Sequence, residues 1–214
     1  MIPANLYPDV YPHLNVADVD IVTGAAGPGR RLVVWLQGCL KRCPGCANGP
    51  FLAERRGEPV AWPTLLARLD GLDGVTLSGG EPVLQAAALA PFAAAVRLRG
   101  QTVVCYSGYT LAELRAEPGA IARLLAQVDL LIDGEYQGDL PRAGAYRPSA
   151  NQHVHLLTDR IPAGACTGNP DTVIRIRRGR VSQTGTLPAA VRAAVFDRLA
   201  AAGIRVRRGE RTDA

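Results

Sequence analysis

The chain has 214 residues, of which 48% are apolar and 20% are charged, and its formal net charge at pH 7 is +5. This length suits one folded domain, or one domain with an appendage. No uninterrupted apolar stretch is long enough to cross a bilayer, so the composition indicates a globular protein and not a membrane-spanning one. Residues 1–5 have neither the basic start nor the apolar centre of a secretory signal. We therefore expect a cytoplasmic protein with reduced thiols.

Short strand-like segments alternate with helix-like segments along most of the chain. The predicted strands are short and apolar, and they cover residues 31–36, 74–78, 102–106, 128–132 and 153–157. Helices are predicted over residues 63–72 and 84–98, and Pro91 could break the second. A further helix should begin at Thr110, which forms a capping-box pattern with Glu113. Strands separated by helices predict a parallel sheet, with the reactive loops after the carboxyl ends of its strands.

The pattern changes at residue 161. Residues 172–176 and 179–183 predict a hairpin, residues 188–202 a helix and residues 204–207 a short strand. We therefore divide the chain into a core, residues 15–160, and a small α+β appendage, residues 161–214. Basic residues gather in the appendage at Arg175, Arg177, Arg178, Arg180, Arg205, Arg207, Arg208 and Arg211. Such a patch could contact nucleic acid or an acidic partner, but a solvated face is the commoner explanation.

Three of the five cysteines crowd into eight residues, directly after the first predicted strand of the core. Cys39, Cys43 and Cys46 have the spacing C-x3-C-x2-C, and in a reducing compartment such crowding indicates metal binding. Three thiolates can bind three corners of a [4Fe–4S] cluster and leave the fourth iron open to S-adenosylmethionine (SAM). The alternative is a zinc site completed by Cys166 or His13. Zinc sites more often pair two separated C-x-x-C units, so the spacing favours the cluster.

A second motif, Ser78-Gly79-Gly80-Glu81-Pro82, follows the second predicted strand of the core. Two glycines let a backbone approach a ligand closely, and Glu81 adds a negative charge at the end of the strand. A Gly-Gly pair on its own is usually a turn. Its place one strand after the cysteine loop favours ligand binding.

These motifs together resemble the radical SAM superfamily, and within it the sequence is most similar to the anaerobic ribonucleotide reductase activating proteins. The resemblance covers roughly residues 15–160 and depends on segments in the same order: residues 36–39, 43–48, 77–82, 106–111, 131–134 and 149–152. It implies an α/β fold, a partial (β/α)6 radical SAM barrel with the cluster and SAM at the carboxyl end of the sheet.

The resemblance also implies the site residues. The cluster ligands would be Cys39, Cys43 and Cys46, and the residues around SAM would be Gly79, Gly80, Glu81, Ser107, Gly108, Asp133 and Asn151. Two of these have ordinary alternatives: Asp133 could be a turn residue before Gly134, and Asn151, with Gln152, could cap a strand. Among the remaining candidates, Cys105 is expected in the core, Cys166 has no assigned role, and His153 and His155 would share one face of a strand.

The implied function is that of an activase. Flavodoxin or ferredoxin would reduce the cluster, SAM would be cleaved to methionine and a 5′-deoxyadenosyl radical, and that radical would take a hydrogen atom from a glycine of a glycyl radical enzyme such as anaerobic ribonucleotide reductase. No catalytic side chain is expected, because the cofactors carry the radical chemistry. Neither a membrane nor nucleic acid is an expected partner.

Two departures from the family pattern keep alternatives open. The family's Arg-Gly-Ser-Ser-Asn-Gln appears here with Pro148 and Ala150, and the minimal members end near residue 160. One alternative is a radical SAM enzyme that acts directly on a small molecule, such as a 7-deazaguanine precursor or a natural-product intermediate. The other is a metal-stabilised module that binds nucleic acid through its arginine-rich end.

Overall fold

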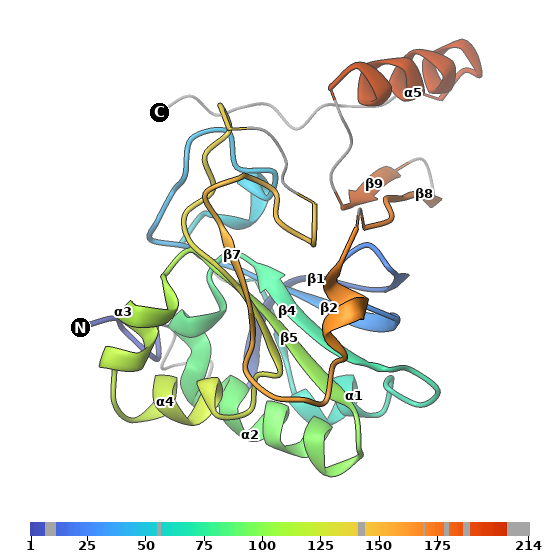
Figure 1. Cartoon of the computed structure of the whole chain (residues 1–214). Helices are drawn as coiled ribbons and strands as arrows, with labels where there is room; N and C mark the ends of the chain where they lie inside the picture. Colours follow the sequence, from blue (N-terminus) through green and yellow to red (C-terminus); the bar gives the residue numbers. More distant parts are fainter. Residues whose placement is uncertain are drawn as a thin grey trace.

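The computed structural model describes residues 1–6, 12–54, 57–140, 144–168, 170–177, 180–185 and 189–204. Its centre is a seven-stranded sheet with the order β3-β1-β2-β4-β5-β6-β7 (Figure 1). The strands are β1 (Leu14–Thr23), β2 (Arg30–Leu36), β3 (Glu58–Val60), β4 (Gly74–Gly79), β5 (Thr102–Ser107), β6 (Leu130–Asp133) and β7 (His153–Leu156). All five strands predicted for the core are confirmed, with ends shifted by one or two residues.

The sheet is mixed, although its central part is parallel. Strands β2, β4, β5 and β6 pair in parallel, whereas β1 forms an antiparallel hairpin with β2 and a second antiparallel pair with β3. Strand β7 runs antiparallel to β6. The prediction of an all-parallel sheet is therefore wrong at both edges, because a hairpin joins β1 to β2 and no described residue between β6 and β7 is in a crossover helix. The structure confirms an α/β fold with a parallel-rich sheet; the described strands do not close into a barrel.

Four short helices cover one face of this sheet (Figure 1). They are α1 (Trp62–Leu66), α2 (Ala86–Leu98), α3 (Leu111–Ala116) and α4 (Ala120–Leu125). The largest group of buried apolar side chains lies between them and the sheet. The helix predicted over residues 63–72 ends early, at Leu66, and the chain then turns through Gly71, which has a left-handed φ of 70°, before β4 begins.

Two local predictions concern helix α2, where Pro91 could break the helix, and the start of α3, where a capping box is expected. Pro91 lies inside α2 without ending it. The Pro91 side chain is exposed, whereas the neighbouring Leu89 and Phe92 are fully buried and hold the helix against the sheet. This packing outweighs the backbone hydrogen bond that proline cannot donate. The capping box is confirmed, because the Thr110 side chain accepts from the Glu113 backbone and the Glu113 side chain accepts from the Thr110 backbone.

Residues just after the predicted core also pack against the sheet, on its other face. Ile161 and Cys166, at the ends of a segment that includes the short 3-10 helix η3 (Ala163–Cys166), are buried against Val104, Leu130 and Ile132. Cys105 is buried on the helix side, as expected. Cys166 therefore has a packing role.

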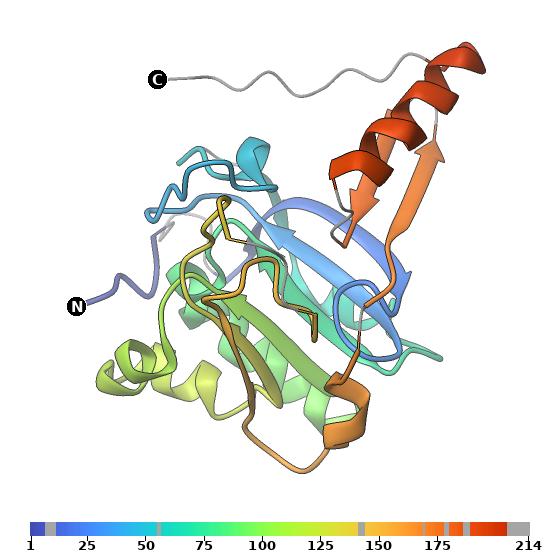
Figure 2. The same ribbon diagram turned by 45° about the horizontal axis from the view of Figure 1, so that its top comes forward.

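The C-terminal part consists of the hairpin β8 (Val173–Arg177) and β9 (Arg180–Thr184), followed by helix α5 (Ala189–Ala201). The predicted hairpin and helix are confirmed, whereas the strand predicted over residues 204–207 falls almost wholly outside the described residues. Figure 2 shows the hairpin and α5 projecting away from the sheet and its covering helices. Arg175 joins the hairpin to the core by bonding the Asp20 carboxylate and the Ile21 carbonyl. None of the described helices is long and apolar enough to cross a membrane.

Candidate functional site

Three loops meet at the carboxyl ends of the parallel strands β2, β4 and β5. The cysteine loop follows β2, the Gly79–Glu81 segment ends β4, and Ser107 and Gly108 end β5. Two backbone hydrogen bonds join the first two loops: Gly80 N donates to Leu36 O at 2.7 Å, and Glu81 N donates to Gly38 O at 2.9 Å. The parallel register thus brings together motifs that are about 40 and 70 residues apart in the sequence.

The two glycines of this site are needed for contact between backbones. A Cβ at Gly80 would lie 2.1 Å from the carbonyl oxygen of Gly38. Gly79 has a left-handed φ of 101°, and a Cβ there would lie 2.3 Å from the backbone nitrogen of Leu36. The Asn48 amide adds a third link by donating to the Gly79 carbonyl at 3.0 Å. Sequence reasoning assigned these glycines to close approach of a ligand, and the structure shows that they let the cysteine loop approach β4.

The cysteine loop turns back on itself between its second and third cysteines. Cys46 N donates to Cys43 O at 3.2 Å, and both Arg42 and Gly45 have left-handed φ values, of 51° and 71°. Cys39 is buried, whereas Cys43 and Cys46 are half-buried. Burial raises the pKa of all three thiols. Metal binding at neutral pH would therefore have to displace protons from them.

The donor set fits an iron–sulfur cluster in its chemistry. All five cysteines are free thiols, and three of them lie on one short loop. In the part of the chain that the structure describes, no three His, Cys, Asp or Glu side chains are already gathered as a ligand set. Binding would thus require the three sulfurs to converge. His13, suggested as a fourth zinc ligand, is exposed and lies outside this loop.

Glu81 is completely buried and links the ends of β4 and β5. Its carboxylate accepts from Gly108 N at 2.7 Å, from the Ser107 hydroxyl at 2.9 Å and from Val83 N at 3.3 Å. Burial raises the pKa of Glu81 to about 7, although these hydrogen bonds act in the opposite direction. Glu81 is therefore hydrogen-bonded to two other residues predicted around SAM, Ser107 and Gly108.

Lys41 extends from the cysteine loop across the same edge of the sheet. Its ammonium group lies 2.9 Å from Glu135 Oε1, 3.9 Å from Glu113 Oε1 and 4.2 Å from the centre of the Tyr109 ring. Burial opposes the charge of Lys41, but the hydrogen bond and charge of Glu135, with smaller contributions from Glu113 and Tyr109, raise its pKa above the ordinary value.

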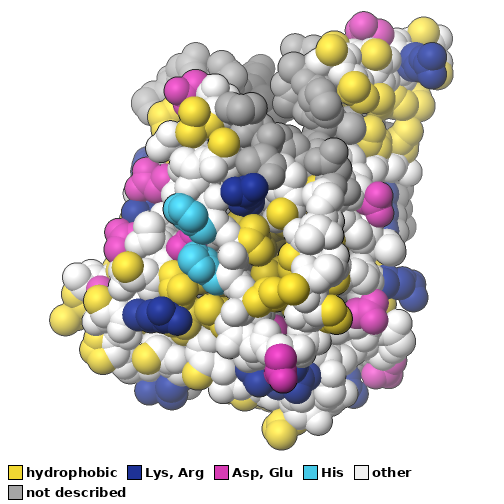
Figure 3. Space-filling view, in the orientation of Figure 1, with side chains coloured by type: hydrophobic (Ala, Val, Ile, Leu, Met, Phe, Trp, Pro, Cys, Tyr) yellow, Lys and Arg dark blue, Asp and Glu magenta, His cyan; other side chains and the backbone are white. Residues whose placement is uncertain are grey.

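Asp133 is buried at the end of β6 and faces α3 and β7. Its Oδ2 accepts from Leu111 N at 2.5 Å, at the first residue of α3. Its Oδ1 lies 3.1 Å from His155 Nε2 and 3.5 Å from His153 Nδ1. The two histidines share one face of β7, as expected, and Figure 3 shows histidine side chains grouped on the surface of this side of the molecule. In the described structure, Asp133 anchors the start of α3.

Asn151 and Gln152 join the two ends of the connection between β6 and β7. The Asn151 amide donates to the Glu135 carbonyl at 2.7 Å, and the Gln152 amide donates to the Gly134 carbonyl at 2.9 Å. Buried Ser149 donates through its hydroxyl to Gln152 Oε1 at 3.2 Å. The Oδ1 atom of Asn151 is buried and has no hydrogen-bond partner among the described residues.

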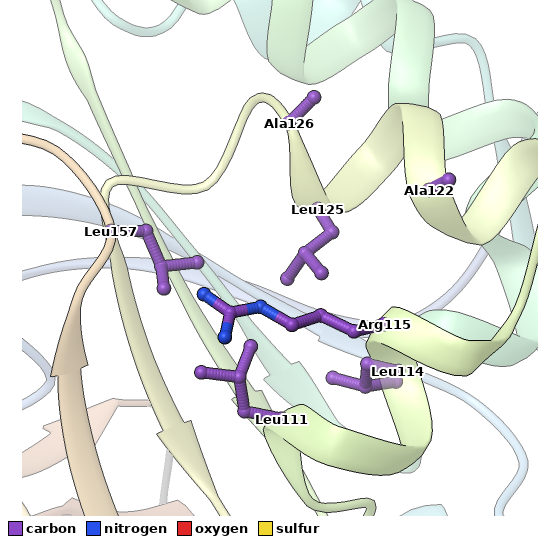
Figure 4. Close-up of a pocket in the computed structure, with 7 residues that line it drawn as sticks. All are labelled: Leu111, Leu114, Arg115, Ala122, Leu125, Ala126 and Leu157. Atoms are coloured by element: carbon purple, nitrogen blue, oxygen red, sulfur yellow. The ribbon is translucent and has the colours of Figure 1, made fainter.

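A separate hollow of about 330 Å³ lies on the helix side of the sheet. Figure 4 shows the Arg115 side chain extending between Leu111, Leu125 and Leu157. None of the predicted site residues lines this hollow. We therefore place the candidate site at the cysteine loop, where the chemically distinctive residues meet.

Sequence reasoning missed three residues of the site: Lys41, Tyr109 and Glu135. One signal was present, because Lys41 is the only lysine in a chain whose other basic residues are all arginine. The positions of Tyr109 and Glu135 follow from the order of β5 and β6 in the sheet, which the sequence pattern alone does not specify.

The sequence of this chain is similar to sequences of known proteins. The family model of the 4Fe-4S single cluster domain matches residues 25–155. The chain is 32% identical over 151 residues to the anaerobic ribonucleoside-triphosphate reductase-activating protein of Salmonella typhi, covering 65% of this chain and 94% of that protein. It is 29% identical over 145 residues to the protein of that name from Enterobacteria phage T4, covering 63% of this chain and 89% of the phage protein. Over a shorter stretch of 81 residues, the chain is 35% identical to the pyruvate formate-lyase-activating enzyme of Listeria monocytogenes, covering 33% of this chain and 32% of that enzyme.

Fold, site and comparisons together define the class: the protein is a radical SAM enzyme of the activating type, with a [4Fe–4S] cluster and SAM as its cofactors. More closely, the chain belongs to the family of anaerobic ribonucleoside-triphosphate reductase-activating proteins. The cofactor of this family is a [4Fe–4S] cluster and not zinc.

Proposed function

We propose that this protein holds its cluster on Cys39, Cys43 and Cys46 and generates a glycyl radical on a partner enzyme, with anaerobic ribonucleotide reductase as the expected partner. The observation that carries the proposal is the packing of the cysteine loop against the Gly79–Glu81 loop, in a chain that aligns with 94% of a named activating protein. The proposed electron donor is flavodoxin or ferredoxin.

Cys39, Cys43 and Cys46 would hold the cluster, which would supply the electron for reductive cleavage of SAM and so the radical chemistry that removes a hydrogen atom from a glycine of the partner. The residues of this chain bind and orient. Three thiols supply the ligands, and the Glu81–Ser107–Gly108 hydrogen bonds fix the ends of β4 and β5 beside them. The free Oδ1 of Asn151 offers an acceptor at the neighbouring strand end.

We also propose two structural features of the chain. The first is the partial (β/α)6 barrel, which the parallel pairing of β2, β4, β5 and β6 supports. The second is the division into a core, residues 15–160, and an appendage, residues 161–214, whose first residues pack with the core. A cytoplasmic location also remains our expectation.

Family membership favours the activase over an enzyme that acts on a small molecule. The nucleic-acid alternative depended on the arginines of the appendage. Arg175 is already bound to Asp20, and residues 205–211 lie outside the described residues.

Electron paramagnetic resonance (EPR) tests the proposal. The reduced protein with SAM and its partner should produce a persistent glycine radical seen as a doublet, and deuterium at the glycine Cα should remove the doublet splitting. A Cys39→Ala variant serves as the control and should give no radical. If no glycyl radical enzyme of the source organism responds, the small-molecule alternative replaces the activase.

A further inference from the structure

Lys41 contacts more of the site than any other charged side chain of the cysteine loop. Its side chain is only 17% exposed, although it begins on a surface loop. Its aliphatic stem passes over Gly108, where a Cβ would lie 3.1 Å from Lys41 Cγ and 3.4 Å from Glu81 Oε2. The lysine therefore lies directly against the hydrogen-bonded ends of β4 and β5.

The ammonium group of Lys41 then reaches two further elements. It bonds Glu135, which follows β6, and lies over the ring of Tyr109, which follows β5. The backbone of Glu135 is in turn bound by the Asn151 amide. One side chain of the cysteine loop is thus connected to all of the strand ends where SAM-binding residues are predicted.

The Glu135 segment makes a second, independent contact with the cysteine loop. Burial raises the pKa of the Cys43 thiol, and the backbone of Tyr136 beside it acts in the opposite direction. A Cβ at Gly138 would lie 3.6 Å from the carbonyl oxygen of Pro44. The cysteine loop and the segment after β6 therefore approach each other at two places, at the Lys41–Glu135 ion pair and between Pro44 and Gly138.

The neighbouring residue shows what an ordinary loop cation looks like. Arg42 is 65% exposed and pairs with Glu54, which is 37% exposed. Arg42 is part of the cysteine loop and Glu54 follows Arg42 by 12 residues, so their pair connects nothing distant. Pairs of this kind contribute little, whereas a charge-assisted hydrogen bond made by a mostly buried group contributes more.

From these contacts we propose that Lys41 is a positioning residue, which holds the cysteine loop against the ends of β5 and β6 and so sets where the cluster lies relative to the SAM-binding loops. The inference deepens the proposed function and rests on it for the presence of the cluster. The Lys41 ammonium is a compact point charge on a flexible stem, and it contacts a carboxylate and an aromatic face together.

The test compares Lys41→Met with Arg42→Met in the full-length protein, reconstituted anaerobically. Lys41→Met should release iron to a chelator about tenfold faster than the wild type, the factor expected for the loss of a charge-assisted hydrogen bond. It should also lose most of the change that SAM causes in the EPR spectrum of the reduced cluster. Arg42→Met should match the wild type in both measurements.

Glu135→Gln, on an exposed residue, probes the same contact from the other side without risk to the fold. It should reproduce the Lys41→Met effects, and the double variant should be no worse than either single one. Lys41→Arg should release iron more slowly than Lys41→Met but faster than the wild type. The spectral change with SAM separates positioning from a general loss of stability.

The proposal is overturned if Lys41→Met and Arg42→Met behave alike, or if the Lys41 and Glu135 effects add independently. These measurements need no partner enzyme. If the Lys41, Arg42 and Glu135 variants behave as predicted while no glycyl radical enzyme is activated, the role of Lys41 is supported and the proposed partner is wrong.

Discussion

The carboxyl edge of the sheet and the C-terminal appendage are built in opposite ways. At the edge, Glu81, Ser107 and Asp133 are buried, and each is hydrogen-bonded to a segment from another strand end. In α5, no described side chain is buried, and the hairpin before it is joined to the core through Arg175 and the half-buried Val173. The predicted site residues thus lie in packed, hydrogen-bonded loops, and we expect changes in the appendage to affect those loops little.

The largest contrast concerns the cysteines of the two regions. Changing Cys39, Cys43 or Cys46 to Ala should abolish the roughly four irons per chain expected after anaerobic reconstitution, because each would remove a thiolate ligand. Changing Cys166 to Ala should leave the iron content intact, since that thiol packs against Val104 and Leu130. Iron analysis and the visible absorption spectrum measure both. Loss of iron from the Cys166 variant alone would reverse the assignment.

The next effect is the pH dependence of stability caused by Glu81. Its folded pKa is raised by burial from 4.5 to about 7, so the folded protein keeps a proton that the unfolded chain releases. The stability from this group is fully present below pH 4.5 and is lost as the pH rises through 7, a change of up to about 3 kcal/mol. In the Glu81→Gln variant, the midpoint temperature of thermal unfolding should change less between pH 5 and 8 than it does in the wild type. A variant that loses stability over this range as steeply as the wild type would contradict the assignment.

A smaller effect is expected from adding one methyl group at Gly80. Because its Cβ would meet the Gly38 backbone at 2.1 Å, Gly80→Ala should lower the free energy of unfolding by about 1–3 kcal/mol and reduce iron retention. Gly164→Ala is the matched control, since a Cβ there has no neighbour within 4 Å. Thermal unfolding and iron analysis compare the two. If the two variants had equal unfolding free energies and iron contents, the loops at Gly80 could separate without loss of stability.

The smallest effect should come from removing α5. A chain ending at Gly185 should keep its cluster and unfold within about 4 °C of the full protein, because an exposed helix contributes little to the core. Circular dichroism and iron content report the outcome. Loss of iron on this truncation would show that the appendage supports the site, which the contacts of α5 do not indicate.

Much of the fold was predictable where the signal is local. The strands β2, β4 and β5 follow from runs of apolar residues, and the start of α3 follows from Thr110 and Glu113 alone. The direction of β7 was not predictable, because an apolar run has the same appearance in a parallel and an antiparallel strand. The length of α1 was overestimated, since Leu69 and Leu72 are buried in a turn.

For the site, the residue types were readable from the sequence: the spacing of Cys39, Cys43 and Cys46 predicts a cluster, and the other motifs mark the strand ends. How these parts meet became visible in the tertiary structure. It placed Gly80 against Gly38, turned the Glu81 carboxylate toward Gly108 and brought Lys41 to Glu135, 94 residues further along the chain. The physical reason is that ligand type depends on residue identity, whereas contacts between distant segments depend on strand order and register, which are set by packing of the whole core.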